Sequence, residues 1–281
     1  MTVPLGQLVG SRPSSARVWD RLRFGKDNYA EDRDAVDAAL QVFPGLLDVA
    51  VRSGEFVDRA VRHVVGGLGV SQVLDIGPGI PVVDAGAPCT HQVARQAAGR
   101  RARVAYVDID PAVLAYRWGR CCVDRAAEVA AVEADLGRPA EVLARAGRVL
   151  DLDEPVVVVL SHVLSWLPPQ TEAVRTVQVL LAGLAPGSHL VVAEPMAGLV
   201  GEPVQAALDA MAALGAPAAR ARDHRQFCEL LLGLHALAPG VVPVSQWRRG
   251  RRADALAVAA LGAVARKPWP EPSAPAPGGR R

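Results

Sequence analysis

VLDIGPGIP, residues 73–81, joins a short apolar strand directly to a glycine-rich turn. Because glycine lacks a Cβ, the backbone at Gly77 and Gly79 can turn sharply and a ligand can approach it closely. The third glycine of a dinucleotide-binding fingerprint is missing, since its place is taken by Val82, which follows a proline. The turn therefore indicates a bound ligand but argues against a pyrophosphate. Glycines that serve only the geometry of an ordinary strand-to-helix turn are the alternative interpretation.

Apolar runs rich in β-branched residues continue along the chain at wide spacing, with helical stretches between them. They are QVLDI at 72–76, RVAYVD at 103–108, EVAAVEAD at 128–135, PVVVVL at 155–160 and HLVVAE at 189–194. Strands of this kind, separated by helices, are typical of a parallel sheet that is covered on both faces. Near the end, GVVPVSQW from Gly240 and ADALAVAALGAVA from Ala253 are separated only by the short RRGRR turn, which suits an antiparallel hairpin. We therefore expect a doubly wound, mostly parallel α/β core whose last strand is antiparallel.

The segments on either side of this core have different patterns. A helix is expected from Ser14 or Ser15, where a hydroxyl can cap ARVWDRLRFG, and an apolar helical period runs from Gly45 to Gly66. The start of the chain lacks a sustained period, and its end is rich in proline with few core-forming residues. The expected divisions are a disordered start at 1–13, an N-terminal helical segment at 14–70, the core at 71–266 and a disordered tail at 267–281.

The composition excludes several classes of protein. The 281 residues are 51% hydrophobic and 21% charged, so the chain can bury a core. With 31 basic and 29 acidic residues it lacks the positive surplus of a protein that binds nucleic acid through phosphates, and RRGRR is better explained as a solvated turn. No apolar run approaches the roughly 18 to 20 residues that cross a bilayer. Neither the four cysteines nor the histidines show metal-ligand spacing, and the cysteine usage fits a reducing cytoplasm. We expect no nucleic-acid, membrane or metal partner.

Two further strand ends supply polar groups next to the glycine turn. YVDIDP places Asp108 at the tip of its strand, where a carboxylate can accept hydrogen bonds from both ribose hydroxyls of a nucleoside. Asp110, which precedes Pro111, suits the role of helix cap better than Asp108 does. Asp135 follows the third strand, where it can contact an adenine amino group, although a loop carboxylate without a ligand is an equal alternative. Consecutive strand ends thus predict a nucleoside site.

These residues resemble the bacterial S-adenosylmethionine-dependent methyltransferases that are known generically as S-adenosyl methyltransferases. The resemblance extends from about residue 16 to residue 267 and includes ARVWDRLRFGKDNYAEDR, VLDIGPGIP, THQVARQ, YVDIDPAVLA, VEADL, PVVVVLSHVLSWLP and GVVPVSQWR. Its most diagnostic element is GKDNY, because methyltransferases in general share the glycine loop but not that segment. The resemblance implies a seven-stranded, Rossmann-like methyltransferase sheet with an antiparallel last strand, S-adenosyl-L-methionine as cofactor and a small-molecule acceptor.

The resemblance also implies roles for individual residues near the strand ends. Carried onto this sequence, the cofactor-binding set is Asp75, Gly77, Gly79, Asp108, Ile109, Asp135, Leu136 and Ser161, with His162 next to the transferred methyl group. Two departures from the family concern the acceptor side. VVDAGAPC at 82–89 looks longer than the usual turn, and Ser165 stands where the family often has a histidine.

Methyl transfer from a sulfonium centre needs alignment more than it needs a nucleophilic side chain. A base is required only if the acceptor atom carries a proton, and the candidates are His162, Tyr29 and Asp84. For His162, a structural histidine at a strand end is the competing interpretation.

The segment from Arg17 to Asp32 is expected to fold over the cofactor as a lid and to contribute to the acceptor pocket. Within GKDNY it offers an ammonium, a carboxylate, an amide and a phenol, from Lys26, Asp27, Asn28 and Tyr29. The alternative is a capped turn between two helices, with Asp27 or Asn28 as the cap.

The sequence therefore predicts an S-adenosylmethionine-dependent methyltransferase that acts on an unidentified small-molecule acceptor. Two other functions remain open on the sequence alone. One is a protein that binds S-adenosylmethionine without catalysis, which the altered 82–89 turn keeps open. The other is a nicotinamide-dependent oxidoreductase, which the missing third glycine disfavours.

Overall fold

The computed structural model describes residues 12–82, 86–98, 102–121, 128–167, 169–198, 203–249 and 257–270. Most of the predicted disordered start and tail, at 1–11 and 271–281, lies outside the described residues. The tail boundary predicted at Lys267 is wrong. The Lys267 ammonium donates hydrogen bonds to the carbonyls of Leu181 and Leu184 at 2.8 and 2.6 Å, so it is fixed to the body of the protein. Pro13, at the other boundary, is buried.

The sheet confirms the doubly wound, mostly parallel prediction. Its strands are β1 Gln72–Ile76, β2 Arg103–Asp108, β3 Glu128–Glu133, β4 Val156–Ser161, β5 His189–Pro195, β6 His235–Ala236, β7 Val242–Pro243 and β8 Ala260–Arg266. The order is β3-β2-β1-β4-β5-β8-β6, with β7 also paired to β8. Strands β1 to β5 pair in parallel, and β8 runs antiparallel to β5, β6 and β7. The described sheet has eight strands rather than the seven expected, because β6 and β7 are two-residue pairings.

The hairpin predicted near the end of the chain is present as the β7–β8 pairing. Val242 lies opposite Gly262, and Pro243 lies opposite Leu261. Residues 250–252, which belong to the RRGRR turn, lie outside the described part of the chain.

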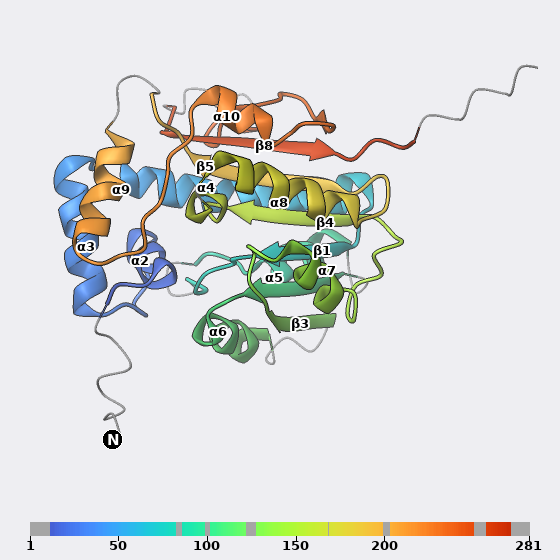
Figure 1. The fold of residues 1–281 in the computed structure, drawn as a ribbon. Helices are drawn as coiled ribbons and strands as arrows, with labels where there is room; N and C mark the ends of the chain where they lie inside the picture. The colour runs from blue at the N-terminus through green and yellow to red at the C-terminus, as the bar shows by residue number, and fades with distance from the viewer. Residues whose placement is uncertain are drawn as a thin grey trace, which may run out of the picture.

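Helices cover both faces of the sheet. They are α2 Ser15–Leu22, α3 Ala30–Val42, α4 Leu46–Arg62, α5 Thr90–Ala98, α6 Pro111–Cys121, α7 Pro139–Ala146, α8 Gln170–Ala182, α9 Val204–Ala213 and α10 His224–Glu229. Helices α4 and α5 pack on one face, while α7, α8 and α10 pack on the other (Figure 1). No helix of the described ranges is long and apolar enough to cross a membrane.

The continuous apolar runs of the central strands supply both cores. In β4, Val157 and Val159 belong to the core under α4, whereas Val158 and Leu160 belong to the core under α8. A strand that is buried on both faces has no polar face, which is why period-two alternation is absent from these runs. All five residues of β1 are buried for the same reason.

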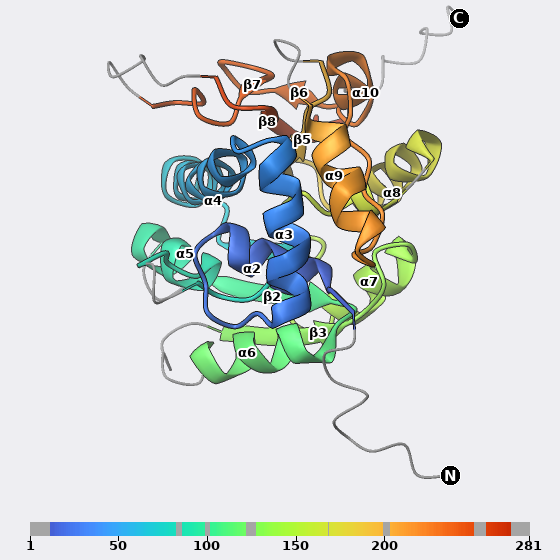
Figure 2. The ribbon, with the colours of Figure 1, turned by 90° about the vertical axis from the view of Figure 1, so that its left-hand side faces the viewer.

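Helices α2, α3 and α9 gather at the end of the sheet where the parallel strands finish (Figure 2). Helix α2 begins as predicted, because the Ser14 hydroxyl accepts a hydrogen bond from the Arg17 amide at 3.2 Å. Asp32 of α3 is fully buried and accepts hydrogen bonds from the Ser14 amide, the Arg17 guanidinium and the Tyr29 amide. A single carboxylate therefore fixes the start of α2 to the start of α3.

Candidate functional site

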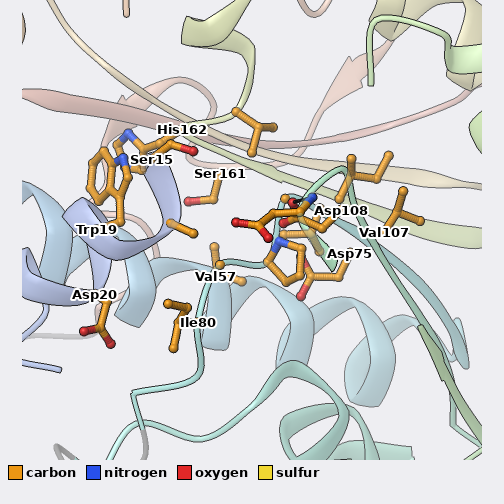
Figure 3. Close-up of a pocket in the computed structure, with 18 of the residues that line it drawn as sticks. Ser15, Trp19, Asp20, Val57, Asp75, Ile80, Val107, Asp108, Ser161 and His162 are labelled. Carbon is orange, nitrogen blue, oxygen red and sulfur yellow. Dashed lines mark hydrogen bonds between the residues drawn. The ribbon is translucent and has the colours of Figure 1, made fainter. Parts of the chain in front are cut away.

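A cavity of about 420 Å³ opens at the carboxyl ends of the parallel strands. It lies where the strand order reverses, since β2 and β3 lie on one side of β1 while β4 and β5 lie on the other. Ligands of open α/β sheets bind at such a switch point. All eight residues of the predicted cofactor-binding set line the cavity, and so does His162. Figure 3 shows Trp19 and His162 together at one end of this cavity, with Ser161 between them and Asp108.

The glycine loop after β1 has the conformation that its sequence requires. Gly77 and Gly79 both have φ of +64°, in the left-handed region that favours glycine. A Cβ on Gly77 would lie 2.2 Å from Val163 Cγ1, so packing also excludes a side chain there. A Cβ on Gly79 would meet nothing within 4 Å. The backbone at Gly79 therefore faces open space in the cavity, as a loop against which a ligand rests must do.

Arg117 of α6 holds this loop in place. Its Nε donates to the Gly79 carbonyl at 2.8 Å, and its Nη2 donates to the Pro78 carbonyl. The guanidinium also lies over the Tyr106 ring, with its Cζ 5.1 Å from the ring centre. Arg117 is 5% exposed, so its donors are shielded from water. Arg117 therefore holds the loop through side-chain hydrogen bonds, whereas a dinucleotide fingerprint has a third glycine there. The sequence analysis did not identify this residue.

Asp108 has the properties expected of a ribose acceptor. One of its oxygens accepts the Asp110 amide at 2.9 Å, while Asp110 in turn caps α6 by accepting the Ala112 amide at 2.8 Å. As predicted, Asp110 rather than Asp108 caps the helix that begins at Pro111. Burial raises the pKa of Asp108 to about 6. A desolvated carboxylate with unused acceptor positions gains when a ligand donates hydrogen bonds to it.

The other two predicted carboxylates hold their surroundings as well as lining the cavity. Asp75 accepts a hydrogen bond from the Thr90 hydroxyl at 2.6 Å, and burial raises its pKa. Asp135 accepts the Gly137 amide at 2.8 Å and so shapes the turn after β3. Asp75 thus lies where the cavity meets the glycine loop, and Asp135 lies where it meets the turn after β3.

His162, directly after β4, is buried beneath Trp19. The two rings stack with centroids 4.3 Å apart at 27°, and neither imidazole nitrogen has a hydrogen-bond partner in the described chain. The backbone of His162 has φ of +59°, which is rare for a residue with a side chain. Burial, together with the charge of Arg23, lowers the pKa of His162 to about 3. The imidazole is therefore neutral, a hydrogen-bond acceptor with unused capacity.

A buried ion pair supports the turn that carries His162. Glu194 of β5 accepts from the Arg222 guanidinium at 3.1 Å and from the Leu164 amide at 3.0 Å. Arg222 also donates to the Leu164 carbonyl at 2.6 Å, so both backbone groups of that residue are held. Burial raises the pKa of Glu194 to about 7, although Arg222 opposes the shift. Ser165 donates to the His162 carbonyl at 3.0 Å and completes the turn.

The N-terminal segment covers the cavity through α2 rather than through GKDNY. Its cavity-lining residues are Ser15, Ala16, Trp19, Asp20 and Arg23. Lys26, Asp27, Asn28 and Tyr29 do not line the cavity. The acceptor-pocket role predicted for these four residues has no support in the geometry, because the diagnostic motif forms the turn after the helix that does the covering.

Each of the motif residues with a described contact supports that turn. The Asn28 amide donates to Asp20 Oδ2 at 2.8 Å and to the Gly25 carbonyl at 3.0 Å, which fixes Asp20 at the cavity wall. Asp27 hydrogen-bonds the Tyr116 hydroxyl of α6, where burial and then the Asp27 charge raise the pKa of Tyr116.

The position of Tyr29 does not suit a general base. It is 45% exposed and begins α3, and the Arg17 guanidinium carbon lies 5.0 Å from the centre of its ring. The position of Tyr29 at the helix start also corrects the alternative in which Asp27 or Asn28 caps that helix. Asp84, the other candidate base, lies outside the described residues.

Sequence reasoning did not single out several charged and aromatic residues of the cavity wall, four of which carry later arguments. Arg117 lies on α6, Asp58 on α4, Trp19 on α2 and Arg23 directly after α2. A charged or aromatic residue on an amphipathic helix gives no local signal that separates a cavity wall from an ordinary surface. Within the part of the chain that the structure describes, no group of three or more His, Cys, Asp or Glu side chains could hold a metal ion.

Comparisons with known proteins point to one family. A family model described as S-adenosyl methyltransferase matches residues 4–268. A DUF574 family protein from Streptomyces avermitilis is 33% identical, with 92% of this chain and 98% of that chain covered and a TM-score of 0.84. A candidate methyltransferase from Thermobifida fusca is 31% identical, with 96% and 100% covered and a TM-score of 0.82. None of the curated proteins compared with the chain matches it.

More distant structures share the fold alone. The CurJ carbon methyltransferase is 15% identical, with a TM-score of 0.51 over 90% of this chain and 66% of that chain. The match of the family model to nearly the whole chain, together with the two relatives above 30% identity, gives the assignment. This chain belongs to the S-adenosyl methyltransferase family.

Proposed function

We propose that the protein binds S-adenosylmethionine in this cavity and transfers its methyl group to a small molecule. The observation that carries the proposal is the pairing of an open glycine loop with a desolvated ribose acceptor. Gly79 presents bare backbone to the cavity, and Asp108 lines the same cavity at the end of the neighbouring strand. A nucleoside lying across the ends of β1, β2 and β3 meets both features.

The residues present fit this cofactor better than a dinucleotide. Asp108 and Ile109 at the end of β2 would hold the ribose, while Asp135 and Leu136 after β3 would border the adenine, and all four line the cavity. The guanidinium of Arg117 is occupied by the carbonyls of the glycine loop. The loop therefore offers a pyrophosphate neither a free guanidinium nor the third glycine of the dinucleotide fingerprint.

When bound, S-adenosylmethionine supplies a methyl group already activated by its sulfonium. The protein then has to orient donor and acceptor and to exclude water, and such positioning accounts for about 7 to 11 kcal/mol of a reaction barrier. Helix α2 covers the cavity with Trp19, and the Glu194–Arg222 pair fixes the turn after β4. These elements give the rigid surroundings that alignment needs.

The acceptor end of the cavity favours a small, largely apolar molecule. The part of its wall that comes from α2, from the turn after β4 and from the segment after α9 includes aromatic, apolar and small residues, namely Ala16, Trp19, Trp166, Leu167, Pro217 and Ala218. The near-neutral charge of the chain adds no electrostatic surface for a nucleic acid. The neutral imidazole of His162 lies at this end, stacked on the Trp19 ring, and can accept a hydrogen bond from a hydroxyl or amine.

Ligand-dependent melting separates the candidate functions. We expect S-adenosylhomocysteine to raise the melting temperature of the protein and NAD to leave it unchanged, because a ligand stabilises only the state that binds it. Stabilisation by NAD alone would favour the oxidoreductase.

Turnover is tested separately from binding. Isotope-labelled S-adenosylmethionine, incubated with the protein and a panel of small aromatic hydroxyl and amine compounds, should yield a labelled product. RNA and DNA are supplied in parallel reactions. Label in the nucleic acid and in none of the small compounds would overturn the proposal of a small-molecule acceptor. Binding of S-adenosylhomocysteine without any transfer would favour the non-catalytic alternative.

A further inference from the structure

Two charged side chains in the cavity wall have no partner within the described chain. The charged residues of the wall are Asp20, Arg23, Asp58, Asp75, Asp108, Asp110, Arg117 and Asp135. Six of them make hydrogen bonds with neighbouring backbone or side-chain groups. The side chains of Arg23 and Asp58 make no hydrogen bond and no ion pair with any described residue, although the charge of each acts on the other. Unpaired charges at the wall of a cavity are unfavourable unless a ligand completes them.

Arg23 and Asp58 come from two elements that meet over the cavity. Arg23 follows α2, and Asp58 lies one turn after Gly54 on α4. A Cβ on Gly54 would lie 2.9 Å from Arg23 Nη2, so the absence of a side chain there makes room for the guanidinium. The wall of α4 at this point consists of Ser53, Gly54, Val57 and Asp58, one face of the helix. The two charges therefore border the same space.

Burial disfavours the charged form of both side chains, so each would be stabilised by a ligand group of opposite charge. Burial lowers the pKa of Arg23, and burial raises the pKa of Asp58 to about 6. Each charge partly offsets the shift of the other, so they lie near each other, yet no ion pair closes between them. The positive charge of Arg23 also lowers the pKa of Asp75 and of His162, which places it beside the ends of β1 and β4.

We infer that Arg23 and Asp58 form a clamp for an α-amino acid group, in which Arg23 binds the carboxylate and Asp58 binds the ammonium. A guanidinium fork matches a carboxylate in two parallel hydrogen bonds, and a carboxylate accepts from an ammonium. The inference rests on the proposed function, because S-adenosylmethionine ends in such a group. An amino-acid acceptor carries the same chemistry.

The position of the clamp assigns it to the cofactor rather than to an acceptor. Asp108 and Asp135 hold the nucleoside at the ends of β2 and β3, so the chain of the ligand continues past Gly77 toward β4. Arg23 lines the same cavity as Asp75 and His162, which come from β1 and from the turn after β4, and its charge acts on both. Binding of the cofactor then joins the end of α2 to α4 through its amino acid group.

The test compares two ligands that differ only at the group in question. S-adenosylhomocysteine carries the amino acid group, whereas 5′-methylthioadenosine keeps the nucleoside and thioether without it. Calorimetry measures the dissociation constant of each for the wild-type protein, Arg23→Met and Asp58→Asn. Arg21→Met is the matched control, because Arg21 lies two residues before Arg23, in the last turn of α2, with a side chain that is 39% exposed and does not line the cavity.

We expect Arg23→Met to weaken S-adenosylhomocysteine by about tenfold or more and to leave 5′-methylthioadenosine within about twofold. Asp58→Asn should show the same selectivity, and Arg21→Met should change neither constant. If Arg23→Met does not fold, the isosteric Asp58→Asn still decides the matter, with the melting temperature as a check on folding.

Three results would overturn the inference. Equal losses for the two ligands would show that the pair only supports the fold. An unchanged preference for S-adenosylhomocysteine would show that its amino acid group binds elsewhere and that the pair serves an acceptor. A wild-type protein that binds neither ligand would refute the nucleoside site, and with it the proposed function. A protein that binds 5′-methylthioadenosine keeps the nucleoside site, so failure of the clamp alone is distinguished from failure of the proposed function.

Discussion

Replacing Asp108 by asparagine tests the ribose contact with the smallest change in shape. Asparagine keeps one carbonyl oxygen, which can still accept the Asp110 amide that Asp108 accepts at 2.9 Å. Its NH2 group replaces the second oxygen and can only donate, so it opposes a ribose hydroxyl donor. The start of α6 is preserved by Asp110, which caps the helix independently. The substitution therefore removes ligand binding capacity rather than local structure.

The expected loss follows from the strength of one charge-assisted hydrogen bond. Hydrogen bonds to charged groups contribute about 1.5 to 3 kcal/mol each, which corresponds to about 10- to 150-fold in affinity. Burial of Asp108 argues against a weaker effect, because few waters compete with the ribose for the carboxylate. We expect Asp108→Asn to weaken 5′-methylthioadenosine by that factor.

The pH dependence has a definite sign. Burial raises the pKa of Asp108 to about 6, so the free carboxyl takes up a proton as the pH falls through 6. Ribose hydroxyls donate to the ionised form, hence affinity is highest above pH 6 and falls toward tenfold per pH unit below it. Asp108→Asn has no proton to take up at this position and should lose that part of the pH dependence.

Calorimetry with 5′-methylthioadenosine between pH 5 and pH 8 measures both effects. This ligand lacks an ammonium, so protonation of Asp58 does not contribute through the clamp. The difference between the wild-type protein and Asp108→Asn isolates the titration of Asp108. Equal affinities at pH 8 in a folded variant, or identical pH profiles for the two proteins, would refute the ribose assignment.

Three further predictions concern the loop and the turn that frame the cavity. Gly79→Val should abolish binding of S-adenosylhomocysteine, whereas Gly233→Val, at φ of +79° with equally open space, should bind normally in calorimetry; loss in both would indicate backbone strain alone. Arg117→Met should weaken S-adenosylhomocysteine at least about tenfold, since two loop carbonyls lose a charged donor; unchanged binding would show that the loop holds itself. Arg222→Met should cost about 3 to 5 kcal/mol of unfolding free energy in urea, because Glu194 is left buried without its partner; a cost below about 1 kcal/mol would contradict this.

The sheet could be predicted because each of its central strands is a continuous apolar run in the sequence. The ends of β1 and β2 fall at the predicted residues, since each apolar run is bounded by residues that interrupt it. The pairing of β6 was missed because two residues are too few to show any period. The order of the strands follows from right-handed crossovers and not from any single segment.

The cavity was predictable only where it is built from strand ends. Asp108 and the glycine loop follow directly from a strand, so their position is fixed by local sequence. Arg23 and Asp58 reach the cavity through the packing of α2 on α4, and a charged residue at helical spacing reads as part of a solvated face. The predicted lid shows the same limit. GKDNY was recognised as a cluster of polar groups, but the direction in which the turn presents them depends on Asp20 and Tyr116.

The place of β8 in the sheet affects how the protein is made. β8 is the last strand of the described residues, yet it lies inside the sheet, between β5 on one side and β6 with β7 on the other. During synthesis the earlier strands leave the ribosome first, at about 5 to 20 residues per second, so β5 waits with an open apolar edge. An open edge of this kind invites pairing with another chain. Nascent chains stalled or cut before residue 260 should therefore aggregate, whereas an affinity tag placed after residue 270 leaves the closing strand intact.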